Sequence, residues 1–240
     1  MFILDNVEKH YGNVSVLKNI SCQIPIDGFV VVMGPSGSGK STLLRLLSFV
    51  ETPDHGNVRL TLNGQEFESI KPTRPWPRVT CVFQKQFLWP HLTLRENIRL
   101  PLHAAGVHEL ESKLNSVINL FGMSAFVDRF PNEVSGGQAQ RAALARALVL
   151  DPQLILIDEA HGGLDLEQQK ILNDYLIKLR ESGVALIIVT HSLEFARRYA
   201  DRVVIVEDGT VTDVGTRDIL ERPRSPYLRR AIGLSTPRGQ

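Results

Sequence analysis

The sequence predicts an α/β fold with a mostly parallel central sheet, an N-terminal antiparallel β layer and an inserted helical subdomain. Short β-branched runs alternate with amphipathic stretches, the first residues alternate apolar with polar side chains, and strand signals disappear between residues 92 and 150. Buried strands that alternate with amphipathic helices are typical of a parallel sheet covered on both faces. These three observations set the fold class before any motif is considered.

The N-terminal third predicts strands of both kinds. Alternating apolar residues at 2–7 and 16–26 predict two antiparallel strands, with Tyr11 and Gly12 on the turn between them. Residues 29–33 form a continuous β-branched run, and a glycine-rich turn leads from it into an amphipathic stretch at 40–49. This order predicts a buried strand, a loop and a helix. Two more strands, 58–62 and 79–83, are expected to flank a proline-rich surface insert at 72–77.

The rest of the chain predicts a helical insertion followed by a return to alternating elements. Helical patterns occur at residues 93–105, 109–121 and 136–150. Strands are then expected at 154–157, 185–190 and 203–206, with helices at 166–182 and 193–199. We therefore expect one domain at 1–234, with its core at 1–84 and 151–234, a helical subdomain at 85–150, and a flexible tail at 235–240.

Composition gives no support to several classes of protein. The net charge of +1 gives no electrostatic footprint for nucleic acid, so no nucleic-acid partner is expected. Cys22 and Cys81 both lie in apolar runs, which favours small buried thiols in a reducing cytoplasm over a disulfide. No apolar run approaches the roughly 20 residues needed to cross a bilayer, and residues 1–8 lack the pattern of a signal peptide. Any role at a membrane is therefore expected from outside the lipid.

A phosphate-binding loop follows the first buried strand. Residues 34–42 read GPSGSGKST, which satisfies G-x-x-x-x-G-K-[ST] directly after a predicted strand and before a predicted helix. Its glycines let backbone N–H groups point at phosphate oxygens, its lysine neutralises the β and γ phosphates, and its first hydroxyl binds Mg²⁺. The pattern predicts a P-loop NTPase that binds nucleotide through Gly34, Pro35, Ser36, Gly37, Ser38, Gly39, Lys40, Ser41 and Thr42.

Two acidic residues end a later strand. Asp158 and Glu159 follow the apolar run at 154–157, at the carboxyl edge of the sheet where open α/β folds bind ligands. We expect Asp158 to hold Mg²⁺ and Glu159 to accept a proton from the water that attacks the γ phosphate. Strand ends often carry charged residues for no such reason, so this interpretation depends on the phosphate loop.

A second glycine-rich segment stands at the head of a predicted helix. Residues 134–141 read VSGGQAQR, and Ser135 with Gln138 forms a capping box. A capping box does not require Gly136 and Gly137, which weaken a helix start and expose N–H groups for an anion. With this segment the chain resembles the ABC ATPase family. The resemblance implies that these four residues contact ATP bound by the phosphate loop of a second subunit.

The resemblance extends over residues 1–233 and assigns further roles. It implies that Gln84 reaches Mg²⁺ and the attacking water, and that Asp165 belongs to the loop that crosses a dimer interface. It implies that His191 contacts the γ phosphate. It also implies that Tyr11 stacks on adenine, with Val16 in the same pocket. For Gln84, Asp165 and His191 taken singly a solvated or structural role is the more common one, so the set carries the argument, whereas for Tyr11 stacking is favoured over a role in covering the core.

One stretch departs from the family pattern, and another points to a partner. Residues 160–163 read AHGG, where relatives commonly carry a proline and small polar residues, and this departure is expected to affect the rate of hydrolysis and the coupling between the two sites.

Phe87, Leu88 and Trp89 lie on a predicted loop beyond Gln84. Exposed aromatic side chains favour a docking site for a helix of a partner, although they could also cap the core of the helical subdomain.

The resemblance implies an ATP-hydrolysing transporter subunit that uses ATP and Mg²⁺. It implies a homodimer, or a heterodimer with a related ATPase, at the cytoplasmic face of the membrane, joined to membrane-spanning permease subunits and an extracytoplasmic solute-binding protein. Within the family the sequence is similar to bacterial importers of polar amino acids. The alternatives are an ATP-gated switch in an envelope or division complex, and an exporter or lipoprotein-release ATPase.

Overall fold

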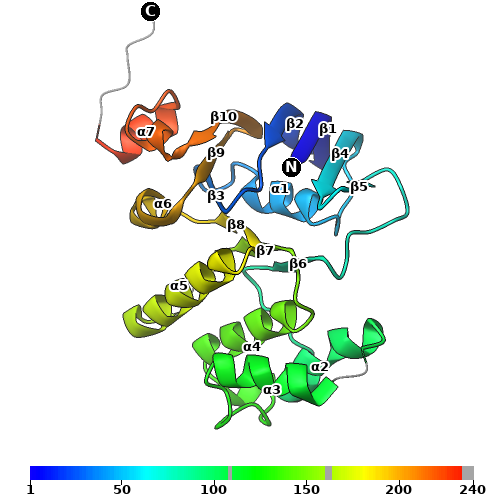
Figure 1. The fold of residues 1–240 in the computed structure, drawn as a ribbon. Coiled ribbons are helices and arrows are strands. Elements are labelled where there is room, and N and C mark those ends of the chain that lie inside the picture. The colour runs from blue at the N-terminus through cyan, green and yellow to red at the C-terminus, as the bar shows by residue number, and fades with distance from the viewer. Residues whose placement is uncertain (108–109, 160–163, 234–240) are drawn as a thin grey trace, which may run out of the picture. The chain divides into compact units, whose positions relative to one another are not determined.

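The computed structural model describes residues 1–107, 110–159 and 164–233. Its chain divides into two compact units, which we call the first and second units (Figure 1). The first unit comprises Met1–Pro75 and the chain from Ala185 onward, and the second comprises Trp76–Val184. The domain limits expected from the sequence stay predictions. The α/β fold class is confirmed by the elements described below.

An antiparallel sheet of four strands opens the first unit. Its order is β2-β1-β4-β5, and its strands are β1 Phe2–Tyr11, β2 Val14–Ile24, β4 His55–Leu62 and β5 Gln65–Glu68. Three of these strands were predicted, and β5 was not. It is joined to β4 through Asn63 and Gly64, both with positive φ, a pair that favours a tight hairpin turn. Tyr11 is the last residue of β1 rather than a residue of the turn.

A mixed set of strands forms the rest of the first unit. The strands β3 Phe29–Met33, β8 Ala185–Val189 and β9 Arg202–Glu207 are parallel, and β10 Thr210–Thr216 joins β9 in the antiparallel direction. Every residue of β3 and β8 is buried, as expected for strands covered on both faces. The predicted parallel strands are confirmed, whereas β10 was missed.

Four helical segments complete the first unit. They are α1 Lys40–Leu47, α6 Leu193–Tyr199, the 3-10 helix η2 Arg217–Leu220 and α7 Pro226–Ala231. Helix α1 contacts both β2 and β8. Phe195 and Tyr199 of α6 pack against Phe29 of β3, with ring centroids 6.0 and 6.4 Å away. These contacts bury the strand that leads into the phosphate loop.

The second unit contains two parallel strands and the predicted helical insertion. Strands β6 Val79–Val82 and β7 Leu154–Asp158 pair in parallel, with Val82 opposite Ile157. Helices α2 Leu94–Ala104, α3 Leu110–Leu120 and α4 Gly136–Leu148 lie side by side (Figure 1). The short η1 Pro131–Glu133 precedes α4, and α5 Leu166–Glu181 follows β7. All four longer helices were predicted. None of the helices that the structure describes has both the length and the apolar character needed to cross a bilayer.

Candidate functional site

The predicted site residues fall into two sets, one in each unit. The first unit carries the phosphate loop, Tyr11, Val16 and His191, and the second carries Gln84, the acidic pair, the SGGQ segment, Asp165 and the aromatic loop. Each set is described by itself below.

The phosphate loop begins directly after β3 and ends in the first turn of α1. The Lys40 side chain is buried, and its ammonium group donates hydrogen bonds to the carbonyl oxygens of Gly34 and Pro35, at 3.0 and 2.6 Å. The loop is closed by a hydrogen bond of 3.3 Å from the Ser38 amide to the Pro35 carbonyl. The lysine charge is thus held on the loop itself, at the N-terminal end of a helix that favours anions.

Two glycines of this loop are required by close contacts. A Cβ atom at Gly34 would lie 1.9 Å from the carbonyl oxygen of Val206 in β9. At Gly39, where φ is 100°, a Cβ atom would lie 2.7 Å from the Leu17 side chain and 3.0 Å from the Val16 carbonyl. The loop is therefore pressed against β9 and β2, and Val16 lies beside it. The place of Val16 in an adenine pocket stays a prediction.

The Ser38 hydroxyl is a buried polar atom with an unusual environment. Ser38 is 4% exposed, and no hydrogen-bond partner for its hydroxyl is found among the described residues. Buried hydroxyls in folded proteins nearly always have a partner, because an unmade hydrogen bond costs about 1–3 kcal/mol. An orphaned donor inside a phosphate-binding loop fits a ligand with oxygen acceptors, as the triphosphate of ATP has. Ser41 is half-buried and Thr42 is buried at the start of α1.

His191 lies at the same edge of the sheet as the phosphate loop. In the parallel pair β3 and β8, Val32 is opposite Val189, and the Thr190 amide donates to the Val32 carbonyl at 3.2 Å. His191 is exposed two residues beyond β8, and Gly34 follows β3 by one residue. The sheet therefore brings this imidazole and the loop to one edge, as predicted for parallel strands.

Gln84 and Glu159 meet in the second unit. They follow the paired strands β6 and β7, and the Gln84 amide donates a 2.9 Å hydrogen bond to Oε2 of Glu159. Glu159 has a φ of 52°, a conformation that is uncommon outside glycine, asparagine and aspartate. Asp158, the last residue of β7, is only 4% exposed. The structure thus joins the predicted base to a predicted glutamine.

The SGGQ segment forms the N-terminus of α4. The Ser135 hydroxyl accepts a hydrogen bond from the Gln138 amide at 3.3 Å, and the Gln138 side chain accepts one from the Ser135 amide at 2.9 Å. The capping box is therefore present. No atom of the described residues lies within 4 Å of a Cβ atom built on Gly136, whereas one on Gly137 would lie 2.3 Å from the Gln168 side chain of α5. Close packing accounts for Gly137 but not for Gly136.

Asp165 is also part of this region. Its side chain caps α5 by accepting a 2.8 Å hydrogen bond from the Gln168 amide, and Gln168 is the residue that crowds Gly137. Burial lowers the pKa of the Arg141 guanidinium of α4, and the Asp165 carboxylate opposes that shift. The four SGGQ residues and Asp165 are therefore neighbours in one unit.

The aromatic loop is exposed and fixed at its backbone. Phe87 is 57% and Trp89 is 54% exposed, while Leu88 is half-buried. Arg146 of α4 donates to the carbonyl oxygens of Gln86 and Phe87, at 2.7 and 2.8 Å. The Trp89 amide donates to Asn97 Oδ1 at 2.7 Å. Sequence reasoning missed Arg146, because its partners lie about 60 residues away along the chain.

One predicted departure cannot be placed. Ala160, His161, Gly162 and Gly163 lie outside the described residues, as does the tail at 235–240. Among the described residues, no group of three or more His, Cys, Asp or Glu side chains could hold a metal ion. The predicted Mg²⁺ set of Ser41, Gln84 and Asp158 is of a different kind, because two of its three members are a serine and a glutamine.

Known proteins provide a separate comparison. A family model described as "ABC transporter" matches residues 17–162. The chain is 40% identical over 238 residues to the sulfate/thiosulfate import ATP-binding protein CysA of Synechocystis, covering 96% of this chain and 65% of that protein. It is 34% identical over 236 residues to a probable protein of the same name from Chlorella vulgaris, covering 97% and 98% of the two chains. The chain thus spans about two-thirds of the Synechocystis relative.

A solved structure agrees in fold. It is a dimeric post-hydrolysis state of an ATP-binding cassette bound to ADP and Pi, with a TM-score of 0.80, 32% identity, and coverage of 90% of this chain and 99% of that one. The names of the two relatives give no support to the prediction of polar amino acids, since both refer to sulfate and thiosulfate. With more than half of its length matched by the family model, the chain belongs to the ABC transporter family, as an ATP-binding domain of that family.

Proposed function

We propose that this chain hydrolyses ATP and thereby drives solute import through separate membrane subunits. The observation that carries the proposal is the hydrogen bond between Gln84 and Glu159 at the end of two parallel strands. The side-chain amide of Gln84 donates to the Glu159 carboxylate and so fixes the orientation of the carboxylate lone pairs. A general base requires such a fixed orientation toward the proton that it accepts. The orphaned hydroxyl of Ser38 supports a triphosphate on the loop of the first unit.

The proposed chemistry divides among a few side chains. Loop amides, Lys40 and Ser38 hold the phosphates, and Glu159 takes a proton from the attacking water. His191 donates a hydrogen bond to the γ phosphate while the bond between the γ phosphorus and the β–γ bridging oxygen weakens. Phosphoryl transfer needs positioning and neutralisation of charge more than covalent chemistry, so these polar groups are sufficient.

The residues proposed for Mg²⁺ fit that ion. Ser41, Gln84 and Asp158 offer a hydroxyl, an amide oxygen and a carboxylate, the hard oxygen donors that Mg²⁺ prefers, and Mg²⁺ usually takes few protein ligands beside substrate phosphates. Because the Gln84 nitrogen donates to Glu159, its carbonyl oxygen is the atom directed to other partners. A bound Mg²⁺ would neutralise charge on the β and γ phosphates.

Pairing of two subunits is part of the proposal. Gly136 has an open environment that packing does not explain, and it stands with Ser135 at the N-terminus of a 13-residue helix. The positive end of a helix of this length favours an anion. We assign that anion to the γ phosphate of ATP on the partner subunit, with Gly137, Gln138 and Asp165 beside it. The two subunits form a homodimer, or a heterodimer with a related ATPase.

The catalytic part of the proposal is tested with Glu159→Gln. This variant keeps the shape of the side chain and one acceptor oxygen, but replaces the second oxygen with an NH2 donor and removes the basicity. We expect ATP hydrolysis to fall by about 1,000-fold, within the range for loss of a general base, while ATP binding persists. Size-exclusion chromatography with ATP should then show a stable dimer.

The matched control is Glu181→Gln, which makes the same change at an exposed position at the end of α5. It should hydrolyse ATP at the wild-type rate and should not accumulate as a dimer. Normal turnover in Glu159→Gln, or a monomer in the presence of ATP, would overturn the mechanism.

Transport of a solute across a membrane requires other subunits that span the membrane. We place the protein at the cytoplasmic face of the membrane, with the exposed Phe87 and Trp89 against a helix of a permease subunit and an extracytoplasmic solute-binding protein in the complex. The proposed solute is sulfate or thiosulfate, as in the names of the relatives. Vesicles that contain the complete complex should accumulate radiolabelled sulfate when ATP is supplied on the side of this chain. Accumulation of glutamine instead would restore the polar amino acid hypothesis, and extrusion would favour an exporter.

A further inference from the structure

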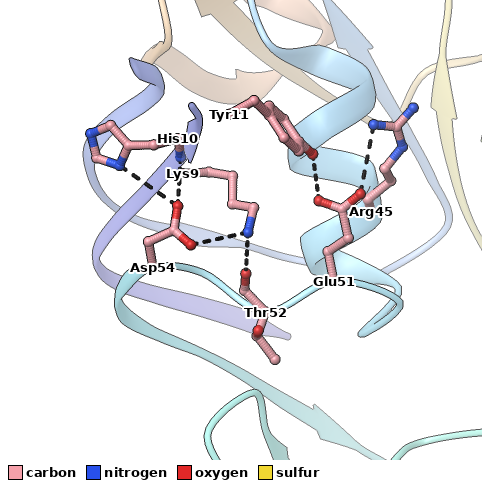
Figure 2. Close-up of polar contacts among 7 residues, drawn as sticks. All are labelled: Lys9, His10, Tyr11, Arg45, Glu51, Thr52 and Asp54. Carbon is pink, nitrogen blue, oxygen red and sulfur yellow. Dashed lines mark hydrogen bonds and ion pairs between the residues drawn. The ribbon is translucent and has the colours of Figure 1, made fainter. Parts of the chain in front are cut away.

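Tyr11 is held by its hydroxyl group, although its ring is exposed. The side chain is 42% exposed at the end of β1, and its hydroxyl donates a hydrogen bond to Oε2 of Glu51 (Figure 2). The other oxygen of the same carboxylate lies 3.7 Å from the Arg45 guanidinium. Glu51 therefore bridges the ring and an arginine with one oxygen for each.

This bridge ends on the helix that follows the phosphate loop. Arg45 lies in the last turn of α1, whose first residue is Lys40. The amides of Val50 and Glu51 both donate to the Arg45 carbonyl, at 3.2 and 3.3 Å. Glu51 is thus tied to α1 by its backbone and by its side chain. Through Glu51, the orientation of the Tyr11 ring is linked to the helix that carries the loop lysine.

A cation occupies the space above the same ring. The Lys9 ammonium lies 5.6 Å from the centroid of the Tyr11 ring, within the range for cation–π attraction. It is held there by Asp54 Oδ1 at 3.1 Å and by the Thr52 carbonyl at 2.9 Å (Figure 2). Asp54 also accepts a 2.6 Å hydrogen bond from the His10 amide. A charge fixed over one face of the ring makes the two faces of the ring different.

We propose that Glu51 and Lys9 are positioning residues that hold the Tyr11 ring as a one-sided stacking platform for the base of the nucleotide. This inference rests on the proposal that Tyr11 stacks on adenine, and it adds Glu51 and Lys9 as the residues that fix the orientation of the ring. Glu51 fixes the rotation of the ring through its hydroxyl, and Lys9 fixes which face receives the base.

The physical reason is preorganisation. An exposed tyrosine samples several rotamers, and a ligand that stacks on it must pay to order the side chain. That ordering cost corresponds to about a 2- to 12-fold change in affinity for one side chain. A ring already fixed by Glu51 avoids this loss. The effect should appear only with ligands that carry a base, because Glu51 contacts no residue of the phosphate loop in the hydrogen bonds and ion pairs described above.

The test is a double-mutant cycle on Glu51 and Tyr11. We expect Glu51→Ala to weaken binding of the β,γ-imido analogue of ATP by about 3- to 10-fold, to raise the KM for ATP by a similar factor, and to leave kcat unchanged. Binding of inorganic tripolyphosphate should not change. Glu51→Gln retains an acceptor for the tyrosine hydroxyl and should restore most of the affinity.

In the background of Tyr11→Phe, which lacks the hydroxyl, Glu51→Ala should have no further effect. An equal loss in both backgrounds, or an equal loss of tripolyphosphate affinity, would overturn the inference, because Glu51 would then act through α1 alone. Lys9→Met keeps the aliphatic stem and should weaken the nucleotide analogue, again without affecting tripolyphosphate; no change would refute the part assigned to Lys9.

Tyr11→Leu separates this inference from the function on which it rests. If Tyr11→Leu binds the nucleotide analogue as tightly as wild type, Tyr11 does not contact the base, and the proposed role of that residue fails. If Tyr11→Leu weakens binding while Glu51→Ala does not, the stacking role stands and only the positioning role fails. Thermal melting of each variant verifies that it is folded.

Discussion

Arg146 should determine how rigid the aromatic loop is. Its guanidinium donates 2.7 and 2.8 Å hydrogen bonds to two successive carbonyl oxygens, those of Gln86 and Phe87. Burial lowers the pKa of Arg146, in accord with a charge that is partly shielded from water. Replacement by methionine keeps an unbranched side chain of similar reach but removes both donors. We expect residues 86–89 in Arg146→Met to open locally while the two units remain folded.

The size of this effect follows from the two hydrogen bonds. A hydrogen bond from a charged donor contributes about 1.5–3 kcal/mol, which gives about 3–6 kcal/mol for the pair. The loop is partly exposed, so the freed carbonyl groups regain water, and we expect about 2–3 kcal/mol to remain. Since about 1.4 kcal/mol corresponds to a factor of ten, the open fraction should rise about 30- to 150-fold.

Hydrogen exchange measured by mass spectrometry tests this prediction on a peptide that contains residues 84–92. Amide exchange at the loop should accelerate by the factor given above in Arg146→Met. It should accelerate less in Arg146→Lys, because a single ammonium lacks the planar fork that bridges two acceptors. Arg129→Met changes an exposed arginine of the same unit and serves as the control. Equal exchange in Arg146→Met and the control would refute the reasoning.

Three further predictions concern other parts of the chain. Gly34→Ala should lower the melting temperature and reduce ATP affinity by at least about 100-fold, measured by calorimetry, because the new Cβ atom would lie 1.9 Å from a backbone carbonyl that cannot move aside cheaply. Normal ATP affinity in this variant would show that the loop has more room than described. Ser135→Asp should keep the stability of α4, since aspartate is an equally good cap, yet abolish ATP-driven dimerisation by placing a carboxylate where a phosphate should bind; chromatography with ATP in the Glu159→Gln background reads the outcome. Burial raises the pKa of the Cys22 thiol from 9.0 to about 11, so its alkylation at pH 8, followed by peptide mass spectrometry, should be about 100-fold slower than that of an unperturbed cysteine. The raised pKa of Cys22 also stabilises the folded state; this contribution is fully present below pH 9.0 and is lost as the pH rises through about 11. A Cys22 thiol that is alkylated at the unperturbed rate would contradict both predictions.

The elements that the sequence predicted correctly are those whose pattern is local. Strands β3 and β8 are continuous apolar runs with every residue buried, so their composition alone identifies them. Strand β10 was missed because its residues are only half-buried or exposed, and its sequence TVTDVGT therefore lacks a continuous apolar run. The Asn63 and Gly64 pair before β5 is a sequence signal for a hairpin turn, and β5 could have been predicted from it. Helix α7 begins with Ser225 and Pro226, which also form a recognisable start.

The candidate site shows the same division between local and distant information. Motif residues such as Lys40 and Glu159 could be named as candidates because their spacing to neighbours in the chain is diagnostic. Glu51 and Arg146 were not, since their partners Tyr11 and Phe87 lie 40 and 59 residues away. No local pattern encodes a contact of that separation. Only the folded chain brings Glu51, which follows α1, to the hydroxyl of Tyr11 at the end of β1.

The SGGQ segment allowed two interpretations, and the structure makes them compatible. A serine hydroxyl has one donor and two acceptor positions. The Ser135 hydroxyl uses an acceptor position for the Gln138 amide, so its hydrogen can still be donated to a phosphate oxygen. The cap therefore orients the hydroxyl for an anion rather than competing with one. Capping alone leaves Gly136 unexplained, because a Cβ atom there would meet no atom within 4 Å in the part of the chain that the structure describes. Under the pairing that we propose, the close approach of a phosphate from a second subunit would account for this glycine.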